Sequence, residues 1–347
     1  MPLRKRRGSE PARAPVGLSS DQRLERRLER RRADRRRRGH RRLATAAVVV
    51  ITLSALAVML LNSGGGKVDQ LRHALRPALR PPAAPILLPR GGRTVLPGRL
   101  VVAYYGIVGT SNILGQTHNP EADAAGVERI ARAYARLDRR VQPAFELVTT
   151  IASPDPGPFA TYSSPIDTAL VRQYLSVAHR HRLLLILDFQ PGRGEFLPEV
   201  RRYARFLRDP AVGVALDPEW KLTAGQVPDQ VIGSSTAAAI NAVSSYLAKL
   251  VRSHRLPQKL FVVHEFRTTE LPDRQRIKFR AGLATVLQMD GLGAPAVKLD
   301  SYRQVMTRAA GFYPGFKLFL RRVDDPVLLT PKQVLALHPR PRYISYQ

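Results

Sequence analysis

Eight short apolar runs between Leu100 and the C-terminus constrain the fold of this 347-residue chain more than any other feature. Apolar runs without polar alternation are typical of strands that are buried on both faces of a parallel sheet. Longer amphipathic stretches separate the runs, and a repeated strand–helix pattern indicates a parallel α/β fold. The runs cover residues 100–105, 144–150, 183–189, 212–216, 260–264, 285–289, 316–320 and 343–346.

The stretches between the runs carry the spacing and the start signals of helices. Residues 166–180 follow Ser-Ser-Pro, and proline in the first turn is typical of a helix start. Eight strands with seven intervening helices predict an α/β fold, a (β/α)8 TIM barrel, over residues 100–347. An open doubly wound sheet is the alternative, but the sequence lacks the glycine-rich phosphate turn typical of that fold. The expected helices are 124–139, 166–180, 198–208, 237–253, 274–283, 302–309 and 330–337.

Polar and aromatic residues gather where the expected strands end, and in a TIM barrel these carboxyl ends surround the active site. Acidic residues recur there, although residues 101–347 carry a net charge of +11. Each of them could cap a loop or pair with an arginine, but together they indicate a functional crevice. The expected catalytic carboxylates are Glu146, Asp188, Asp217, Glu219 and Glu265. The expected substrate-binding residues are Tyr104, Tyr105, Gln190, Trp220, His264, Phe266, Asp290, Lys317 and Tyr346.

The Asp-Pro-Glu-Trp sequence after the fourth run has the sharpest chemical implication. On an extended chain, Asp217 and Glu219 point to the same side, roughly 6.5–7 Å apart. A carboxylate that stays ionised raises the pKa of its neighbour, which can then act as a general acid, and glycoside hydrolysis needs this division of roles. We expect Glu219 to be the acid and Asp217 to tune or orient it. Glu146 or Glu265 is the expected base, and Trp220 would offer a flat face to a sugar ring.

Some chemistries are excluded by what the sequence lacks. It contains no cysteine, so disulfides, thiolate zinc sites and cysteine nucleophiles are impossible. It contains neither a GxSxG nucleophile elbow nor an HExxH zinc motif. We therefore expect no cofactor and no metal. The alternative is a divalent metal ion held by Asp188, Asp217, Glu219 and Glu265.

An uncharged run of 19 residues, at positions 43–61, precedes the strand–helix region. As a helix it would extend about 28 Å, just enough to cross the hydrocarbon core of a bilayer. A cleaved signal peptide is the alternative, but the basic region before the run is too long and no small-x-small cleavage site ends it. The sequence therefore predicts one uncleaved transmembrane helix within residues 43–62.

Arginine dominates the segment before this run. Residues 1–42 carry 17 Lys/Arg and 5 Asp/Glu, and the last 17 of them hold 11 Arg, against four Lys/Arg in the 20 residues after Leu61. The positive-inside rule places this segment in the cytoplasm, as a disordered tail or a charged helix, and the C-terminal domain outside the cell membrane. The tail has no aromatic residue for base stacking, so we expect contact with membrane lipid and no nucleic-acid partner. Residues 63–99, rich in Gly and Pro, are expected to form a stalk.

The Asp-x-Glu at the end of a fourth barrel strand resembles the TIM-barrel glycoside hydrolases, especially the chitinase-like and muramidase-like groups. The order YYG, PAFEL, LLLILDFQPG, VALDPEW, VVHEF and terminal YISYQ also resembles a bacterial family of membrane-anchored, exported barrels of glycosidase type. The resemblance covers residues 100–347 and implies carboxylate acid/base hydrolysis of a polysaccharide. Two features depart from it. The DxxDxDxE run of chitinases is missing, and Lys317 stands in the seventh run, where many retaining enzymes keep a nucleophile, which argues against double displacement.

These features predict a membrane-anchored, extracytoplasmic barrel of glycosidase type that acts on an envelope or extracellular polysaccharide. A barrel that binds glycan in the same crevice without turnover is the first alternative. A second alternative makes the basic tail the functional part and the barrel a passive sensor. Under the first two hypotheses, the basic surface of the domain favours anionic wall polymers as ligands.

We predict that protease added to intact cells removes the barrel and leaves residues 1–42 uncut, because the arginine bias of the flanks places the tail in the cytoplasm. Immunoblots against tags at the two ends of the chain measure this. The same digestion after detergent lysis is the control and should remove both tags. A barrel that stays protected in intact cells contradicts the predicted orientation.

Overall fold

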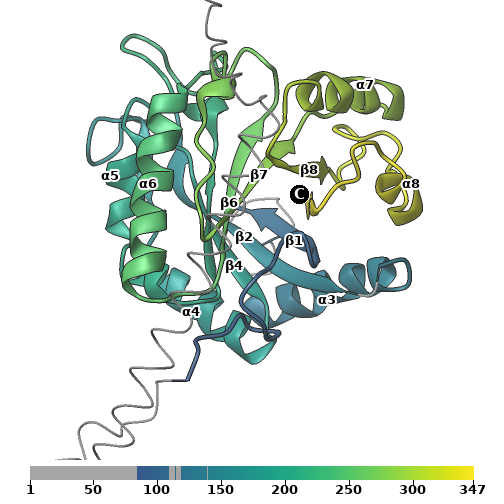
Figure 1. Cartoon of the computed structure of the whole chain (residues 1–347). Helices are drawn as coiled ribbons and strands as arrows, with labels where there is room; N and C mark the ends of the chain where they lie inside the picture. The colour runs from purple at the N-terminus through teal and green to yellow at the C-terminus, as the bar shows by residue number, and fades with distance from the viewer. Residues whose placement is uncertain (1–83, 109–113, 115–118, 139) are drawn as a thin grey trace, which may run out of the picture. The chain divides into compact units, whose positions relative to one another are not determined.

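The computed structural model describes residues 84–108, 114, 119–138 and 140–347 (Figure 1). The predicted tail, the predicted transmembrane helix and residues 63–83 of the predicted stalk lie outside this part of the chain. Within it, no helix is long and apolar enough to cross a membrane. The predictions for the N-terminal segments therefore stay predictions.

In the described residues, eight parallel strands form a closed barrel, which confirms the predicted α/β barrel. The strands are β1 (Leu100–Gly106), β2 (Val141–Ala152), β4 (Leu184–Phe189), β5 (Val212–Leu216), β6 (Lys259–Glu265), β7 (Leu283–Met289), β8 (Tyr313–Leu318) and β9 (Tyr343–Tyr346). β1 pairs with β2 on one side and with β9 on the other, so the first and last strands close the sheet. This closure excludes the open doubly wound alternative. A short strand, β3 (Ser163–Pro165), adds to β2 in the antiparallel direction.

Helices lie outside the barrel, between successive strands (Figure 1). They are α3 (Pro120–Ala135), α4 (Thr168–Arg180), α5 (Phe196–Arg202), α6 (Ala237–Ser253), α7 (Pro295–Met306) and α8 (Pro331–Leu335), with the 3₁₀ turns η2 (Phe206–Arg208), η3 (Pro218–Trp220) and η4 (Arg274–Arg276). Local sequence starts several of them. The Asn119 side chain accepts the first free N–H groups of α3, and Thr330 with Gln333 forms a capping box at α8.

The helix predicted at 274–283 is wrong, because the chain forms only the turn η4 there before β7 begins. The side chain of Asn241, on α6, explains the difference. Its amide nitrogen donates to the carbonyl of Arg276 at 2.9 Å, and its oxygen accepts the N–H of Lys278 at 2.7 Å. These bonds engage backbone groups that a continuing helix would use for itself.

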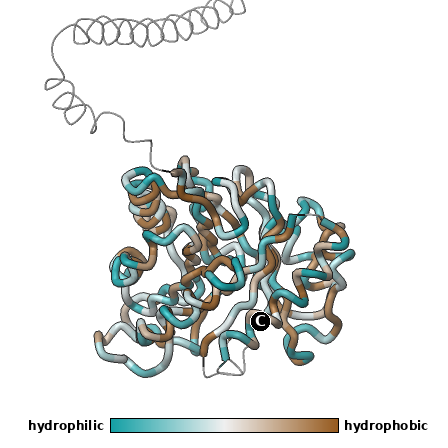
Figure 2. The backbone as a smooth tube through the Cα atoms, turned by 90° about the horizontal axis from the view of Figure 1, so that it is seen from below, coloured by the Kyte–Doolittle hydropathy of each residue, from teal (hydrophilic) through white to brown (hydrophobic). Residues whose placement is uncertain are grey.

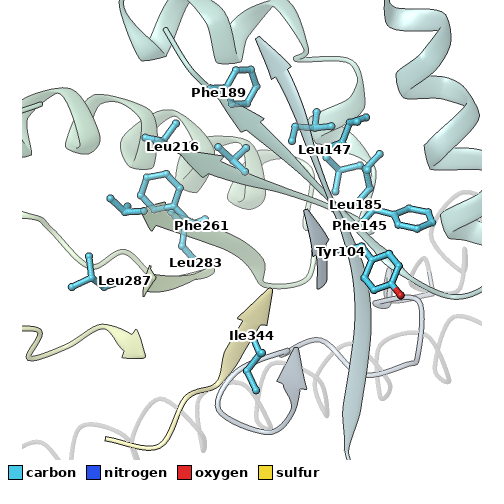
Figure 3. Close-up of a cluster of buried hydrophobic side chains, with 14 of the residues drawn as sticks. Tyr104, Phe145, Leu147, Leu185, Phe189, Leu216, Phe261, Leu283, Leu287 and Ile344 are labelled. Atoms are coloured by element: carbon cyan, nitrogen blue, oxygen red, sulfur yellow. The ribbon is translucent and has the colours of Figure 1, made fainter. Parts of the chain in front are cut away.

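Side chains on the barrel strands alternate between the two faces of the sheet. Those that point outward, such as Phe145, Phe261 and Ile344, pack under the helices in the larger hydrophobic cluster (Figure 3). Along the chain of the domain, hydrophobic and hydrophilic stretches alternate accordingly (Figure 2). Side chains that point inward form a second cluster, and four of its members mark the interior face of their strands: Ala144, Ile186, Ala215 and Val262.

Residues 84–99, which the sequence assigned to the stalk, pack against the barrel. Leu88, Val95 and Leu96 are buried in the interior cluster with residues of the strands. The side-chain oxygen of Gln258 accepts the N–H groups of Val95 and Leu96, at 2.7 and 3.0 Å. Arg93 donates to the carbonyls of residues 255 and 256, so backbone groups at the end of α6 are also satisfied. The compact unit consequently begins at Ala84 and not at Leu100.

We predict that deleting residues 342–347 strongly destabilises the barrel. Tyr343, Ile344 and Tyr346 are buried, and burial of each such side chain contributes about 1.5–3 kcal/mol. Loss of β9 also leaves β1 and β8 with unpaired edges. Calorimetry should show the unfolding transition lowered by on the order of 10 °C or lost. Val323→Ala, at a position that is 74% exposed, should leave Tm unchanged. An unaltered Tm in the truncated chain contradicts closure by β9.

Candidate active site at the carboxyl ends of the strands

A cavity of about 510 Å³ opens where the barrel strands end. The β5–α6 and β7–α7 connections supply its aliphatic rim, and the strand ends and the turn η3 supply its polar floor. Seven of the residues predicted from the sequence line it: Tyr105, Gln190, Glu219, Trp220, Phe266, Asp290 and Lys317.

Four further predicted residues are buried inside the barrel, below this floor. Each lies two positions after a residue of the interior cluster, so each shares that inward face. The ring of His264 reaches from β6 across to β2, where its Nε2 lies 3.0 Å from Glu146 Oε1. The four residues are Glu146, Asp188, Asp217 and His264.

Three predicted residues point to the helix side of the barrel instead. The ring of Tyr104 lies against Gly126 of α3, so closely that a Cβ at Gly126 would be 2.7 Å from it. The hydroxyl of Tyr346 lies 2.7 Å from that of Tyr134. The carboxylate of Glu265 forms a buried ion pair with Arg274. None of these three is among the described residues that line the cavity.

The geometry of Asp217 and Glu219 differs from the expected extended pair. β5 ends at Leu216, and Pro218, whose ring fixes φ near −65°, begins the 3₁₀ turn η3. Asp217 stays in the barrel interior, while Glu219 is half-buried and lines the cavity. Carboxylate oxygens of Asp217, Glu219 and Asp290 lie within 4.8 Å of one another. The turn therefore brings Glu219 close to a carboxylate from β7 as well as to its own neighbour.

His264 is held between two carboxylates. Its Nδ1 lies 3.1 Å from Asp290 Oδ2, and its Nε2 lies beside Glu146. Burial lowers the pKa of His264, but hydrogen bonds to both carboxylates outweigh burial and raise it well above its usual value. This shift favours the imidazolium form of the ring, and its Nδ1 fixes the position of one oxygen of Asp290.

Asp290 remains ionised at neutral pH. Burial favours its neutral form, but the hydrogen bond with His264 and the charge of Lys317 lower its pKa below the ordinary value. The ammonium of Lys317 lies 3.8 Å from Asp290 Oδ2 and 3.5 Å from the centroid of the Tyr105 ring. This cation–π contact limits where the ammonium can move.

Glu219 has the opposite character. Burial, and then the negative charge of Asp290, raise its pKa to about 7. Burial and the charge of Glu219 likewise raise the pKa of Asp217 well above its ordinary value. A carboxyl that holds its proton near neutral pH thus lies beside a carboxylate that has lost it. Such a separation of pKa values within one site is what acid/base catalysis requires.

Several buried carboxylate oxygens in the site make no hydrogen bond within the described part of the protein. They include Glu146 Oε2, Asp188 Oδ2, Asp217 Oδ1 and Asp290 Oδ1. Buried acceptors without a partner are rare, and a catalytic role or a bound water or ion accounts for such groups in proteins. Asp217 Oδ2 accepts a hydrogen bond from Gln190 at 3.3 Å, whereas Oδ1 of the same carboxyl is buried without a partner among the described residues.

The carboxylates that approach one another differ from the metal ligands considered in the sequence. Among the described residues, the group with suitable spacing is Asp217, Glu219 and Asp290, without Asp188 or Glu265. Carboxylate oxygens suit Mg²⁺ or Ca²⁺. The imidazolium of His264 and the ammonium of Lys317, however, already place two positive charges beside Asp290. Acid/base chemistry accounts for this arrangement more directly than a hard cation does.

Sequence reasoning missed the loop residues of the site. The rim contains Val231, Ile232 and Leu292, each 41–45% exposed, and no periodic pattern identifies such positions. Glu270, which is buried behind the floor, was also missed. It accepts the N–H groups of Phe266 and Arg267, and burial raises its pKa to about 9. The sequence feature that could have identified Glu270 is its position shortly after His264-Glu265-Phe266.

Comparison of the sequence with known protein families and with curated proteins found no match. The function of the barrel is therefore inferred from the chemistry of its own residues.

Proposed function

We propose that the barrel is a glycoside hydrolase in which Glu219 is the general acid and Asp290 is the second catalytic carboxylate. The observation that carries this proposal is that Glu219 and Asp290 line one cavity with carboxylate oxygens within 4.8 Å of each other, where the pKa of Glu219 is raised to about 7 and that of Asp290 is lowered. Glycosidases use two carboxyl groups with these two protonation states on either side of the bond that breaks.

The spacing of the two groups favours retention of configuration. Oxygens of Glu219 and Asp290 lie within 4.8 Å of each other. Retaining enzymes keep their carboxyl groups roughly 5–5.5 Å apart, whereas inverting enzymes leave about 6.5–9.5 Å for a water molecule. The argument against double displacement rested on Lys317 in the seventh run, and a carboxylate from the sixth run supplies the missing nucleophile in this proposal.

The proposed reaction has two steps. Asp290 Oδ1 attacks the anomeric carbon, the glycosidic C–O bond breaks with its electron pair on the departing oxygen, and that oxygen takes the proton of Glu219. Water then attacks the anomeric carbon, gives a proton to Glu219, and releases the sugar and the Asp290 carboxylate. Asp290 Oδ2 is held by His264, whereas Oδ1 is buried and has no hydrogen-bond partner among the described residues, so Oδ1 is the oxygen assigned to the attack.

His264 and Lys317 would act through Asp290. Both carry positive charge beside its Oδ2, so they stabilise the carboxylate, which makes it a better leaving group in the second step. Tyr105, Trp220 and Phe266 line the cavity and offer aromatic faces to sugar rings. Gln190 bonds both Tyr105 and Asp217 and so links the aromatic part of the site to its acidic part.

We further propose that the substrate is a polysaccharide of the envelope or the extracellular space, and that residues 43–62 anchor the enzyme at the cell membrane. The support is the sequence: the apolar run at 43–61 and the arginine-rich flank before it. A barrel that binds glycan without cleaving it is the remaining alternative, and the next experiment distinguishes the two.

We predict that Glu219→Gln lowers turnover of cell-wall polysaccharide on the order of 10²-fold or more, because the amide cannot donate the proton. Release of reducing ends by the purified protein measures turnover, and Tm should change little because Glu219 is half-buried. Asp229→Asn is the matched control, since Asp229 also lines the cavity but is exposed. Unaltered turnover in Glu219→Gln would contradict the assignment of Glu219 as the acid. If the unmodified protein binds glycan but does not cleave it, the binding alternative is favoured.

We predict that turnover falls as the pH rises through about 7, because Glu219 must keep its proton and burial holds its pKa near that value. The positive charge of Lys317 lowers the pKa of Glu219. Lys317→Met should therefore move the alkaline limb of the pH–rate profile to higher pH, besides slowing the reaction. An alkaline limb that stays in place contradicts the assignment of that limb to Glu219.

A further inference from the structure

A second hollow lies on the outer wall of the barrel, between α5 and α6, which run side by side in Figure 1. Its volume is about 580 Å³, and it belongs to helix surfaces and not to strand ends. We call it the α5/α6 groove. Its basic lining residues are Arg201, Arg208, Lys249 and His254, and no acidic residue is among the described residues that line it.

The groove is long because of the sequence of α6. Positions 242, 245, 246, 249 and 253 line it, and this spacing follows one face of a helix for three turns. From position 242 to position 253 the helix rises by about 16 Å. Ala242, Ser245 and Ser253 are small, so the groove stays open along that length. A site of this length suits a chain with repeating units better than one small anion.

The cations of the groove are available for binding. Arg201, Arg208 and Lys249 are exposed, and none forms an ion pair with an acidic side chain in the described part of the protein. Arg202, the next residue after Arg201, pairs with Glu199 and does not line the groove. Three exposed cations without an acidic partner in the described part of the protein therefore line one groove.

An aromatic ring completes the wall. The guanidinium of Arg201 lies 5.5 Å from the centroid of the Tyr246 ring, a contact that orients the planar cation. Guanidinium groups bind phosphate through paired hydrogen bonds, and a tyrosine ring gives an apolar face to the uncharged part of a ligand. The two side chains together therefore suit a polymer that alternates phosphate with an uncharged unit.

We propose that the α5/α6 groove binds a linear phosphodiester polymer of the cell envelope, and that it holds the barrel on this polymer independently of the chemistry at the strand ends. Charge complementarity selects a polyanion. The concave shape between two helices suits a chain more than the flat surface of a bilayer. The proposal does not depend on the glycosidase assignment, because no residue of the groove lines the catalytic cavity.

Hydrogen exchange of the full-length protein, read peptide by peptide with poly(glycerol phosphate), tests the proposal. The readout must be local, since the arginine-rich tail attracts polyanions in every variant. We expect protection of residues 196–208 and 237–254. The triple variant Arg201→Ser, Arg208→Ser, Lys249→Ser should lose this protection. Turnover of glycan at the cavity should be unchanged, so a failure here is separable from a failure of the proposed reaction.

The matched control removes three exposed cations that lie outside the groove: Arg132→Ser, Arg276→Ser and Lys332→Ser. This control should keep the protection of α5 and α6, and an equal loss in both triple variants would show that only overall charge matters and would overturn the proposal. Dextran should give no protection, and equal protection by this neutral chain also overturns it. Protection by phosphatidylglycerol vesicles alone would assign the groove to lipid, and stronger protection by an oligonucleotide would assign it to nucleic acid. Absence of protection with every probe would remove the site.

Discussion

The hydrogen bonds of His264 to Glu146 and Asp290 are the interaction on which the candidate site depends. They join β6 to β2 and β7 across the interior of the barrel, where most comparable folds place apolar side chains. All three groups are buried, and removing one partner of such a network leaves an uncompensated charge that costs about 3–5 kcal/mol. The network is therefore stable only when all three partners are present. The same hydrogen bonds hold the strands in position and favour the ionised form of Asp290.

The strands could be predicted from continuous apolar runs, and the site residues because polar and aromatic side chains occur where those runs end. The apolar runs located all the barrel strands, and His264 and Asp188 fall on the inward face of theirs. The same runs could not show which face is inward, because strands buried on both sides are apolar on both. Tyr105 and Tyr104 illustrate this limit: they are adjacent in sequence and equally apolar in context, but the first lines the cavity and the second packs on α3.

Tertiary contacts decided what the sequence left open. The 3₁₀ turn at Pro218 carries Glu219 toward Asp290, and only the pairing of distant strands determines that Asp290 is there to meet it. The Gly- and Pro-rich segment before β1 has the composition of a linker. It packs under the barrel because Gln258, far along the chain, accepts its backbone N–H groups. The composition of the segment gives no information about a distant hydrogen-bond partner such as Gln258.

The charged side chains of the cavity and those of the α5/α6 groove differ in how strongly water and salt screen their interactions. At the strand ends the carboxylates are buried beside His264 and Lys317, so their interactions act through a medium that water and salt barely screen. The cations of the α5/α6 groove are exposed, and charges of that kind lose most of their mutual influence beyond about 8 Å at physiological ionic strength. Binding at the groove would therefore weaken as salt rises, while the ionisation of the buried Asp290 would change little. In a barrel the catalytic residues lie at the strand ends, and the outer helices form much of the solvent-exposed surface. Substitutions in the α5/α6 groove can therefore change polymer binding and its salt dependence without changing the residues of the cavity.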